Sequence, residues 1–471
     1  MLTYSFENAG SDSLYEYLYK CIKNDILNGT LPPDYKLPSK RSFAKNLGVS
    51  TITVENSYAQ LIAEGYIYSL PKKGYYVSDI SQLQILKPAE IISSHEPDSK
   101  QNSYIADITT NHTNTDSFPI YTWSKLMKEV IAERSSDLLI SSPCGGIFEL
   151  RNAISSHLKA FRGMNIKPEQ IIIGAGTEYL YGLLIQLLGR NNTFAVEDPG
   201  YHKLRLIYQS NNVNCISLPM TFDGIDINAV NESTADILHL SPSHHYPTGI
   251  VTSISRRYEL LNWALQNDRR YIIEDDYDCE FRLLGKPIPS LQSIDISGRV
   301  IYMNTFTKTL ASTIRISYMV LPPNLLKRFN ETLMFYSCTV SNFEQYTLAR
   351  FISAGHFEKH INRMRIYYRK QRDALINAIN ESHLASLVTI HEENAGLHFL
   401  MKVNTDLTDI ELVENARKNG LKITCLSQYY TSPEIEDTHT LVVNYSGITE
   451  KMIENVVELL YKTINCDLSE Y

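Results

Sequence analysis

The stretch GRVIYMNTFTKTLASTIRISYMVLPP, residues 298–323, decides the fold of most of this chain. Its two apolar, β-branched runs are typical of strands buried on both faces, and Lys308 lies on the connection between them. Runs of the same kind occur earlier, in QIIIGAGT, NTFAVEDPGY, ADILHLSPSHHYPTG and RRYIIEDDYD, and helical patterns separate them. Buried strands that alternate with helices predict a mostly parallel sheet in an α/β domain.

The unusual residues of this region lie at the carboxyl ends of the expected strands, where α/β sheets bind their ligands. Gly176 and Thr177 follow one strand and open a helix, so backbone amides and a hydroxyl there can hold a phosphate. Tyr201 follows another strand and can stack on a flat ring. Taken alone, each motif has a structural explanation, a tight turn or a packed tyrosine.

Two further motifs add ionisable groups. The run EDDYD, residues 274–278, places four acids behind an apolar strand, where a solvated acidic turn is the alternative to a ligand site. Lys308 lies among hydroxyl residues such as Thr305, and Arg315 follows seven residues later. A desolvated lysine can lose its proton and form a Schiff base, while a hydroxyl and an arginine bind phosphate strongly. Together these groups meet the needs of pyridoxal 5′-phosphate (PLP): a lysine, an acid for the pyridine nitrogen, a stacking ring and a phosphate cup.

Over almost its whole length this region resembles the fold-type I, class I aminotransferases, which carry PLP. The resemblance implies an α/β domain with a smaller C-terminal α+β subdomain. It implies that Lys308 forms the Schiff base with PLP and that Asp275 faces the pyridine nitrogen, with Asp276 or Glu274 as alternatives. The remaining implied roles are a bond from Tyr277 to the ring 3′-oxygen, stacking by Tyr201, and phosphate binding by Thr305, Arg315, Gly176 and Thr177.

The chain departs from that family in the loop before residue 250. The family's Asn-Pro-Thr-Gly is Tyr246-Pro247-Thr248-Gly249 here, so the asparagine is missing. His244 and His245 precede it and serve either the ligand or the structure. His356 and His360 have helical spacing, but Phe357 stands where an HExxH motif has its glutamate, so we expect no metal site.

The first 79 residues predict a different domain. An amphipathic helix over residues 11–28 is followed by LPSKRSFAKNLGVSTITVENSYAQLIAEGYIY, residues 37–68. In this stretch Ser39 and Ser50 are expected to cap two short helices that are joined at Gly48. The strands YIYSL and GYYV around Lys72 and Lys73 then complete a winged helix-turn-helix.

The charge of this head suits double-stranded DNA. Between residues 35 and 77 there are six Lys or Arg and two acidic residues, although the whole chain has a net charge of −8. Phosphate contacts are expected from Lys40, Arg41, Lys72 and Lys73, and contacts at the opening of the second helix from Ser50, Thr51, Thr53 and Asn56. A helical protein-interaction module with a solvated charged face is the alternative.

The string from Leu37 to Val77 resembles the DNA-binding domain of GntR-family regulators, although Thr51 stands where that family usually has an arginine. With the region behind it, the chain resembles the MocR-type branch of that family. The resemblance implies a homodimer that binds operator DNA. We expect a winged helix-turn-helix domain at 1–79, a linker at 80–106 and an aminotransferase-like domain at 107–471.

Composition is consistent with a cytoplasmic protein. The N-terminus lacks the order of a secretory signal, and no run of about 18 apolar residues could span a bilayer. The seven cysteines are scattered singly, which argues against disulfides and a zinc ribbon.

The ligand that such a regulator senses remains open between PLP itself and a small amino compound. Class I aminotransferases bind a substrate carboxylate through an arginine whose matching position here is Gly447, and a second ligand-binding arginine of the GABA-responsive relative matches Lys203. The missing arginines favour PLP as the signal and pyridoxal biosynthesis as the target, with no catalysis. A true aminotransferase with an appended head, or a degenerate body that only dimerises, are the alternatives.

Overall fold

The computed structural model describes residues 2–6, 10–80, 104–110, 117–283, 288–392, 396–432 and 437–465. The chain divides into two compact units, Met1–Gln101 and Asn102–Tyr471. The predicted linker lies almost entirely outside the described residues, and its last residue, Ala106, begins a strand of the second unit. No helix among the described residues is long and apolar enough to cross a membrane.

The first unit is a winged helix-turn-helix, as predicted. Its elements are α1 (Leu14–Leu27), β1 (Lys36–Leu37), α2 (Lys40–Leu47), α3 (Thr51–Ala63), β2 (Ile67–Leu70) and β3 (Gly74–Val77). The Ser39 hydroxyl accepts a bond from the Ser42 amide, and the Ser50 hydroxyl caps α3 in the same way. Gly48 ends α2 at φ 66°, a conformation that favours glycine, and so turns the chain into α3.

The core of this unit lies between the three helices and the wing. Leu18, Ile22 and Ile26 of α1 pack against Phe43 of α2 and Tyr58 of α3. The predicted stripe on the first helix was too long, because Leu14 is 47% exposed at the first residue of α1.

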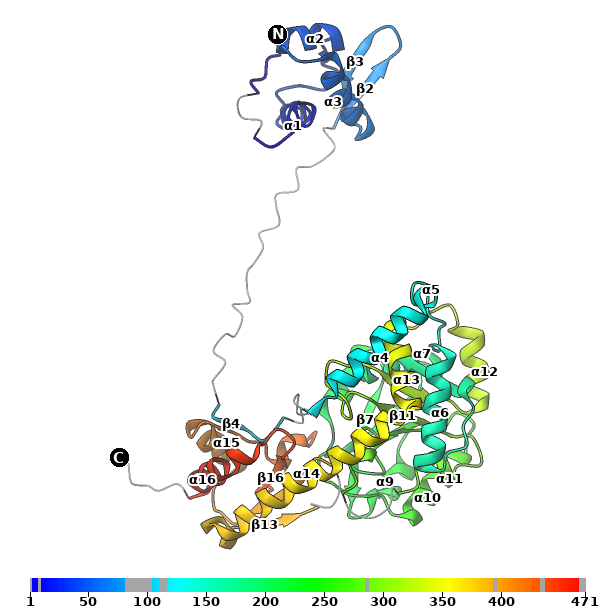
Figure 1. The fold of residues 1–471 in the computed structure, drawn as a ribbon, viewed down its shortest axis with the longest axis vertical. Coiled ribbons are helices and arrows are strands. Elements are labelled where there is room, and N and C mark those ends of the chain that lie inside the picture. Colours follow the sequence, from blue (N-terminus) through cyan, green and yellow to red (C-terminus); the bar gives the residue numbers. More distant parts are fainter. Residues whose placement is uncertain are drawn as a thin grey trace, which may run out of the picture. The chain divides into compact units, whose positions relative to one another are not determined.

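The second unit is built on one large sheet with the strand order β5-β12-β11-β10-β9-β6-β7-β8 (Figure 1). Strands β7, β6, β9, β10 and β11 pair in parallel, whereas β12 pairs antiparallel with both of its neighbours. The mostly parallel α/β sheet is therefore confirmed. The strands are β5 (Ile171–Gly174), β6 (Phe194–Asp198), β7 (Cys215–Thr221), β8 (Gly224–Ile225), β9 (Ile237–Leu240), β10 (Tyr271–Asp275), β11 (Val300–Thr305) and β12 (Ser317–Val320).

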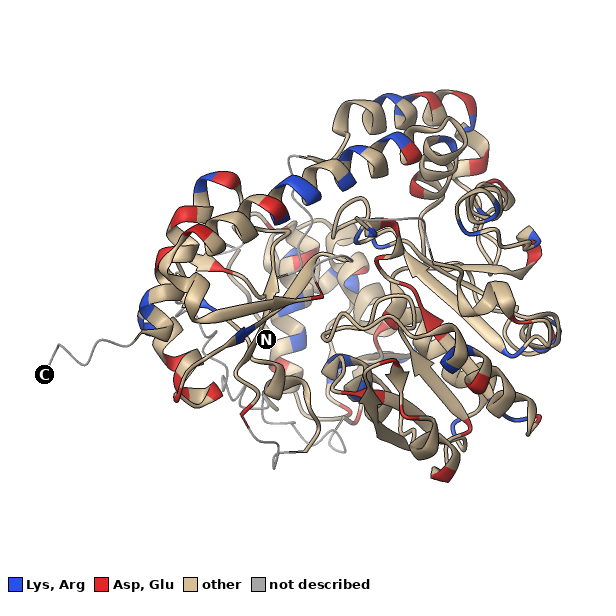
Figure 2. Ribbon diagram, turned by 90° about the horizontal axis from the view of Figure 1, so that it is seen from below, with Lys and Arg blue, Asp and Glu red and all other residues tan. Residues whose placement is uncertain are grey.

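Helices cover this sheet, and the apolar faces they bury form two clusters around its strands. Charged residues lie along the helices, while the strands are mostly uncharged (Figure 2). The helices are α4 (Ile120–Glu133), α5 (Ser135–Leu138), α6 (Phe148–Arg162), α7 (Thr177–Leu188), α8 (His202–Ser210), α9 (Ile227–Glu232), α10 (Ile254–Leu265), α11 (Leu291–Ile294), α12 (Pro323–Thr332) and α13 (Asn342–Ser353).

The long helix α14 (His356–Glu381) leads from this layer to a smaller C-terminal subdomain (Figure 1). There β13 (Val388–His391), β14 (His398–Val403) and β16 (Thr440–Asn444) form an antiparallel sheet with α15 (Asp409–Lys418) and α16 (Ile453–Ile464). Strand β15 (Leu421–Lys422) pairs in parallel with β4 (Ala106–Asp107). The predicted α+β subdomain is thus confirmed.

Candidate functional site

A cavity of about 420 Å³ opens where the parallel strands of the large sheet end. The described residues that line it come from the ends of β6, β9, β10 and β11, from the start of α7 and from the segment after β4. All eight residues that the sequence predicts for the cofactor lie on its wall: Gly176, Thr177, Tyr201, Asp275, Tyr277, Thr305, Lys308 and Arg315. Residues up to 139 positions apart in the sequence are therefore brought to one site.

Asp275 is the acid of the 274–278 run that faces this cavity. Its Oδ2 accepts a 2.5 Å hydrogen bond from the Tyr181 hydroxyl and lies 3.5 Å from Nε2 of His239. Its Oδ1 is buried and accepts no hydrogen bond from any residue that the structure describes. A buried carboxylate oxygen without a donor is costly, so this atom is suited to a ligand that brings a donor of its own.

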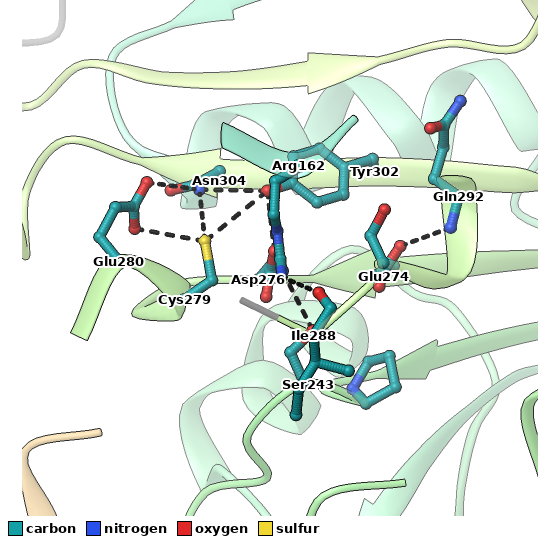
Figure 3. Close-up of polar contacts among 12 residues, drawn as sticks. Arg162, Ser243, Glu274, Asp276, Cys279, Glu280, Ile288, Gln292, Tyr302 and Asn304 are labelled. Atoms are coloured by element: carbon teal, nitrogen blue, oxygen red, sulfur yellow. Dashed lines mark hydrogen bonds and ion pairs between the residues drawn. The ribbon is translucent and has the colours of Figure 1, made fainter. Parts of the chain in front are cut away.

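The two alternative acids point to the opposite side of the sheet, because successive residues of a strand face opposite ways (Figure 3). Glu274 accepts bonds from the amides of Leu291 and Gln292 at 2.7 and 2.8 Å. Asp276 forms a fully buried ion pair with Arg162 and accepts a 2.8 Å bond from the Tyr302 hydroxyl. Both therefore hold the sheet to its covering elements and leave Asp275 at the cavity.

Lys308 follows β11 and is buried beside the cavity. Burial lowers the pKa of its amine, because the charged form loses hydration, and the carboxylate of Asp278 partly offsets that effect. Tyr277, also on the wall, has its hydroxyl 3.4 Å from Nδ1 of His244, and burial raises the pKa of Tyr277. A lysine with a lowered pKa offers more of the neutral amine that attacks a carbonyl carbon.

The start of α7 and Arg315 form a cationic end of the cavity. Gly176 has a φ of 91°, and a Cβ there would lie 2.6 Å from Nη2 of Arg315, so only glycine lets the guanidinium approach the helix start. Arg315 is 3.3 Å from the carboxylate of Glu178, which also forms an ion pair with Lys203. These two cations lower the pKa of Glu178, with Lys203 the larger cause. The Thr305 hydroxyl accepts a 2.8 Å bond from Ser317.

Sequence reasoning missed several residues of this wall. His239 lies on β9 with Nδ1 bonded to the Tyr208 hydroxyl at 2.6 Å, and no described residue bonds its Nε2. Glu197 on β6 lies 3.5 Å from His245. Burial raises the pKa of Glu197 to about 8 and lowers the pKa of His245 to about 3, so both are held in their neutral forms. An alternation of apolar residues gives no signal of these polar side chains, and only the sheet register brings them to Asp275.

The residues predicted to contact DNA lie on the exposed side of α2, α3 and the wing. Arg41, Thr51, Asn56, Lys72 and Lys73 are exposed, while Ser50 and Thr53 join their hydroxyls at 2.8 Å in the cap of α3. Lys40 forms a 2.6 Å ion pair with Glu55 of α3, which the sequence did not predict. Ile52, in the first turn of α3, is 68% exposed and presents an apolar side chain on this surface.

Comparison with known proteins agrees with both units. A family model described as bacterial regulatory proteins of the gntR family matches residues 14–77. The chain is 38% identical to the HTH-type transcriptional regulator YdeL of Bacillus subtilis, over 95% of this chain and 96% of that one. It is 31% identical to the probable rhizopine catabolism regulatory protein MocR of Rhizobium meliloti, over 95% and 93% of the two chains. This chain belongs to the MocR-type branch of the GntR family.

Two further similarities bear on this MocR-type regulator. It is 29% identical to the pyridoxine biosynthesis transcriptional regulator PdxR of Corynebacterium glutamicum, over 89% of each chain. The kynurenine aminotransferase of Pyrococcus horikoshii superposes with a TM-score of 0.67 at 23% identity and covers 78% of this chain and 92% of its own. The second similarity shows that the body of the regulator has the fold of the fold-type I aminotransferases.

Proposed function

We propose that this MocR-type regulator senses PLP in the cavity of its aminotransferase-like body and controls genes of vitamin B6 biosynthesis. The observation that carries the proposal is the unpaired Oδ1 of Asp275, which faces a cavity that also presents Lys308. Position 447, where the aminotransferases hold a substrate carboxylate with an arginine, is a glycine. The cavity thus suits the cofactor better than an amino-acid substrate.

The residues of the wall fit PLP. Asp275 would accept a bond from the pyridine nitrogen, Tyr277 would hold the 3′-oxygen, and Tyr201, which is 53% exposed, would stack on the ring. The amides that open α7, with Thr177, Arg315 and Thr305, would hold the phosphate. PLP supplies an aldehyde that a neutral amine can bind covalently, and the lowered pKa of Lys308 favours that amine.

Sensing, rather than catalysis, is the role we assign to this site. Among the described residues of the cavity wall Arg315 is the only arginine, and it lies at the phosphate end. Lys203, the other cation at the mouth, is paired with Glu178. An amino-acid carboxylate therefore meets no bidentate partner, a loss of about 1.5–3 kcal/mol for each charged hydrogen bond. The relatives that match along the whole chain are named as regulators, which agrees with this role.

A small amino compound is the second candidate ligand. The name of the Rhizobium meliloti relative refers to rhizopine catabolism, whereas the Corynebacterium glutamicum relative is named for pyridoxine biosynthesis. The cavity extends beyond the cofactor residues to Thr109, Lys203 and Tyr246, which could face such a compound. In that case PLP would be the resident cofactor and the amine would be the signal.

We further propose that two copies associate and present two heads to an operator. Large apolar side chains are exposed on α4, α5 and the segment after α12, with Tyr121 at 91%, Leu139 at 82% and Phe335 at 76%. Exposed apolar area of this kind is typical of an association surface. A symmetric pair would match an operator with two half-sites.

Titration of the full-length protein tests the proposal. PLP added to the apo-protein is expected to give a visible absorption band and to change the affinity for the promoter of its own neighbouring genes. The Lys308→Ala variant should keep its fold and its basal DNA affinity but lose the cofactor response. Unchanged DNA binding with PLP, together with a response to an amino compound at micromolar concentration, would instead support the second candidate.

A further inference from the structure

The segment that joins the predicted linker to the body also forms part of the cavity wall. Residues 104–110 enter the body as strand β4 and continue to Thr109, which lines the cavity. Thr109 is the described wall residue nearest in sequence to the DNA-binding head. A ligand in the cavity therefore lies against the place where the tether of the head is fastened.

Hydrogen bonds fasten this segment to the C-terminal subdomain. The Ile105 amide donates to the Gly420 carbonyl at 2.7 Å, and the Ile108 amide donates to the Lys422 carbonyl at 3.1 Å. The side chain of Ile105 lies against Gly420, where a Cβ would meet it at 2.9 Å. Strand β4 has only two residues, so few bonds hold it to β15 and small changes in its surroundings can alter their stability.

Thr109 is connected to this strand by its own side chain. Its hydroxyl and its amide both donate to Oδ1 of Asp107, at 2.7 and 2.8 Å. The other carboxylate oxygen of Asp107 accepts a 3.2 Å bond from Lys422 of β15. A change at the Thr109 hydroxyl is therefore passed through Asp107 to the pairing of β4 with β15.

A second contact ties the same segment to the cavity. The carbonyl of Thr109 accepts a 3.1 Å bond from the side chain of Asn444, and the Asn444 amide donates to the carbonyl of Ile108 at 2.9 Å. Asn444 is fully buried and also bonds Tyr246, a wall residue. Two independent sets of bonds thus converge on residues 107–109.

We propose that Thr109 is a ligand-contact residue and that, through Asp107, it transmits occupancy of the cavity to strand β4 and so to the tether of the DNA-binding head. This inference rests on the proposed function, because it takes PLP as the ligand. Ligand contact at Thr109 orders residues 104–110 and strengthens the pairing of β4 with β15. The unliganded protein has a more weakly held tether.

Hydrogen exchange of the full-length protein tests the proposal, with PLP as the probe. PLP should slow exchange of the Ile105 and Ile108 amides at least about fivefold, the lower end of typical coupling between sites. In Thr109→Val, which has nearly the same shape but no hydroxyl, PLP should still give its absorption band while this slowing and the change in DNA affinity are lost. Thr109→Ser, which restores the hydroxyl, should recover both.

Thr110→Val is the matched control, because Thr110 is the next residue and is not among those that line the cavity. It should behave as the wild type. The proposal is wrong if Thr109→Val binds PLP and retains the full change in DNA affinity, or if exchange at residues 104–110 is the same with and without bound PLP. Absence of PLP binding in the wild type would overturn the proposed function as well.

Discussion

The Tyr181 hydroxyl donates a 2.5 Å hydrogen bond to Oδ2 of Asp275, which leaves Oδ1 facing the cavity without a described donor. The bond fixes the orientation of the carboxylate, and a ligand can then use the free oxygen. Tyr181 lies on α7 and Asp275 ends β10, so the helix that opens at the phosphate end of the cavity also positions the acid at its floor.

Tyr181→Phe is therefore expected to weaken PLP binding by about tenfold, because a hydrogen bond to a charged group contributes on the order of 1.5 kcal/mol. Absorbance titration with PLP measures the effect. Tyr179→Phe, on the same helix but outside the cavity wall, is the control and should bind as the wild type. Equal affinities for all three proteins would show that Asp275 does not need this orientation.

Glu178→Gln is expected to tighten PLP binding several-fold. The Glu178 carboxylate is paired with Arg315 and Lys203, so a phosphate must compete with it for both cations. Since both pairs are partly exposed, salt screens them and the difference from the wild type should shrink as ionic strength rises. Glu331→Gln, on the exposed surface of α12, serves as the control. Weaker binding by Glu178→Gln would mean that Glu178 supports the phosphate site.

Glu197→Gln tests the buried acid of the wall through the pH dependence of stability. The folded pKa of Glu197 is about 8, above its ordinary value of 4.5, so the unfolded state releases this proton first. The wild type should then lose stability as pH rises from about 4.5 to 8, whereas the amide does not titrate. Thermal unfolding should show that the Tm advantage of Glu197→Gln grows from pH 5 to pH 8. An advantage that is constant over this range would contradict the raised pKa.

Gly447→Arg is expected to give the regulator a response to amino acids. A Cβ at Gly447 meets only Thr110, at 3.7 Å or more, so a larger side chain can be accommodated at its base. A bidentate arginine there should improve amino-acid binding at least about tenfold, which absorbance titration of the PLP-loaded protein would detect. Gly447→Ala controls for the change in the backbone. No gain in the arginine variant would show that this position does not face the ligand.

Ile52→Ala is expected to relax the DNA sequence preference of the head at one thymine. The exposed Ile52 side chain opens α3, and apolar side chains in the major groove contact the thymine methyl group. Duplexes selected by the wild type should lose roughly 1 kcal/mol of affinity, about fivefold, when that thymine is replaced by deoxyuridine. Ile52→Ala should bind both duplexes equally. A deoxyuridine penalty that persists in the variant would assign the contact to another residue.

The sequence by itself determined the two domains, the class of each and the residues of the ligand site. Apolar runs of strand length and residues at their carboxyl ends carry this information locally, as at Lys308 and Asp275. Capping serines and glycine turns did the same for the head, at Ser39, Gly48 and Ser50.

Only the tertiary structure decided which acid of the 274–276 run faces the cavity and what supports it. The choice depends on the side of the sheet to which each strand residue points, and Arg162, from a helix 114 positions away, pairs with Asp276 on the far side. The partners of Asp275, the pairing of Lys40 with Glu55, and the route from Thr109 to β15 are likewise contacts between distant segments. Local pattern does not encode such contacts, because they form only when the sheet order and the helix packing bring those segments together.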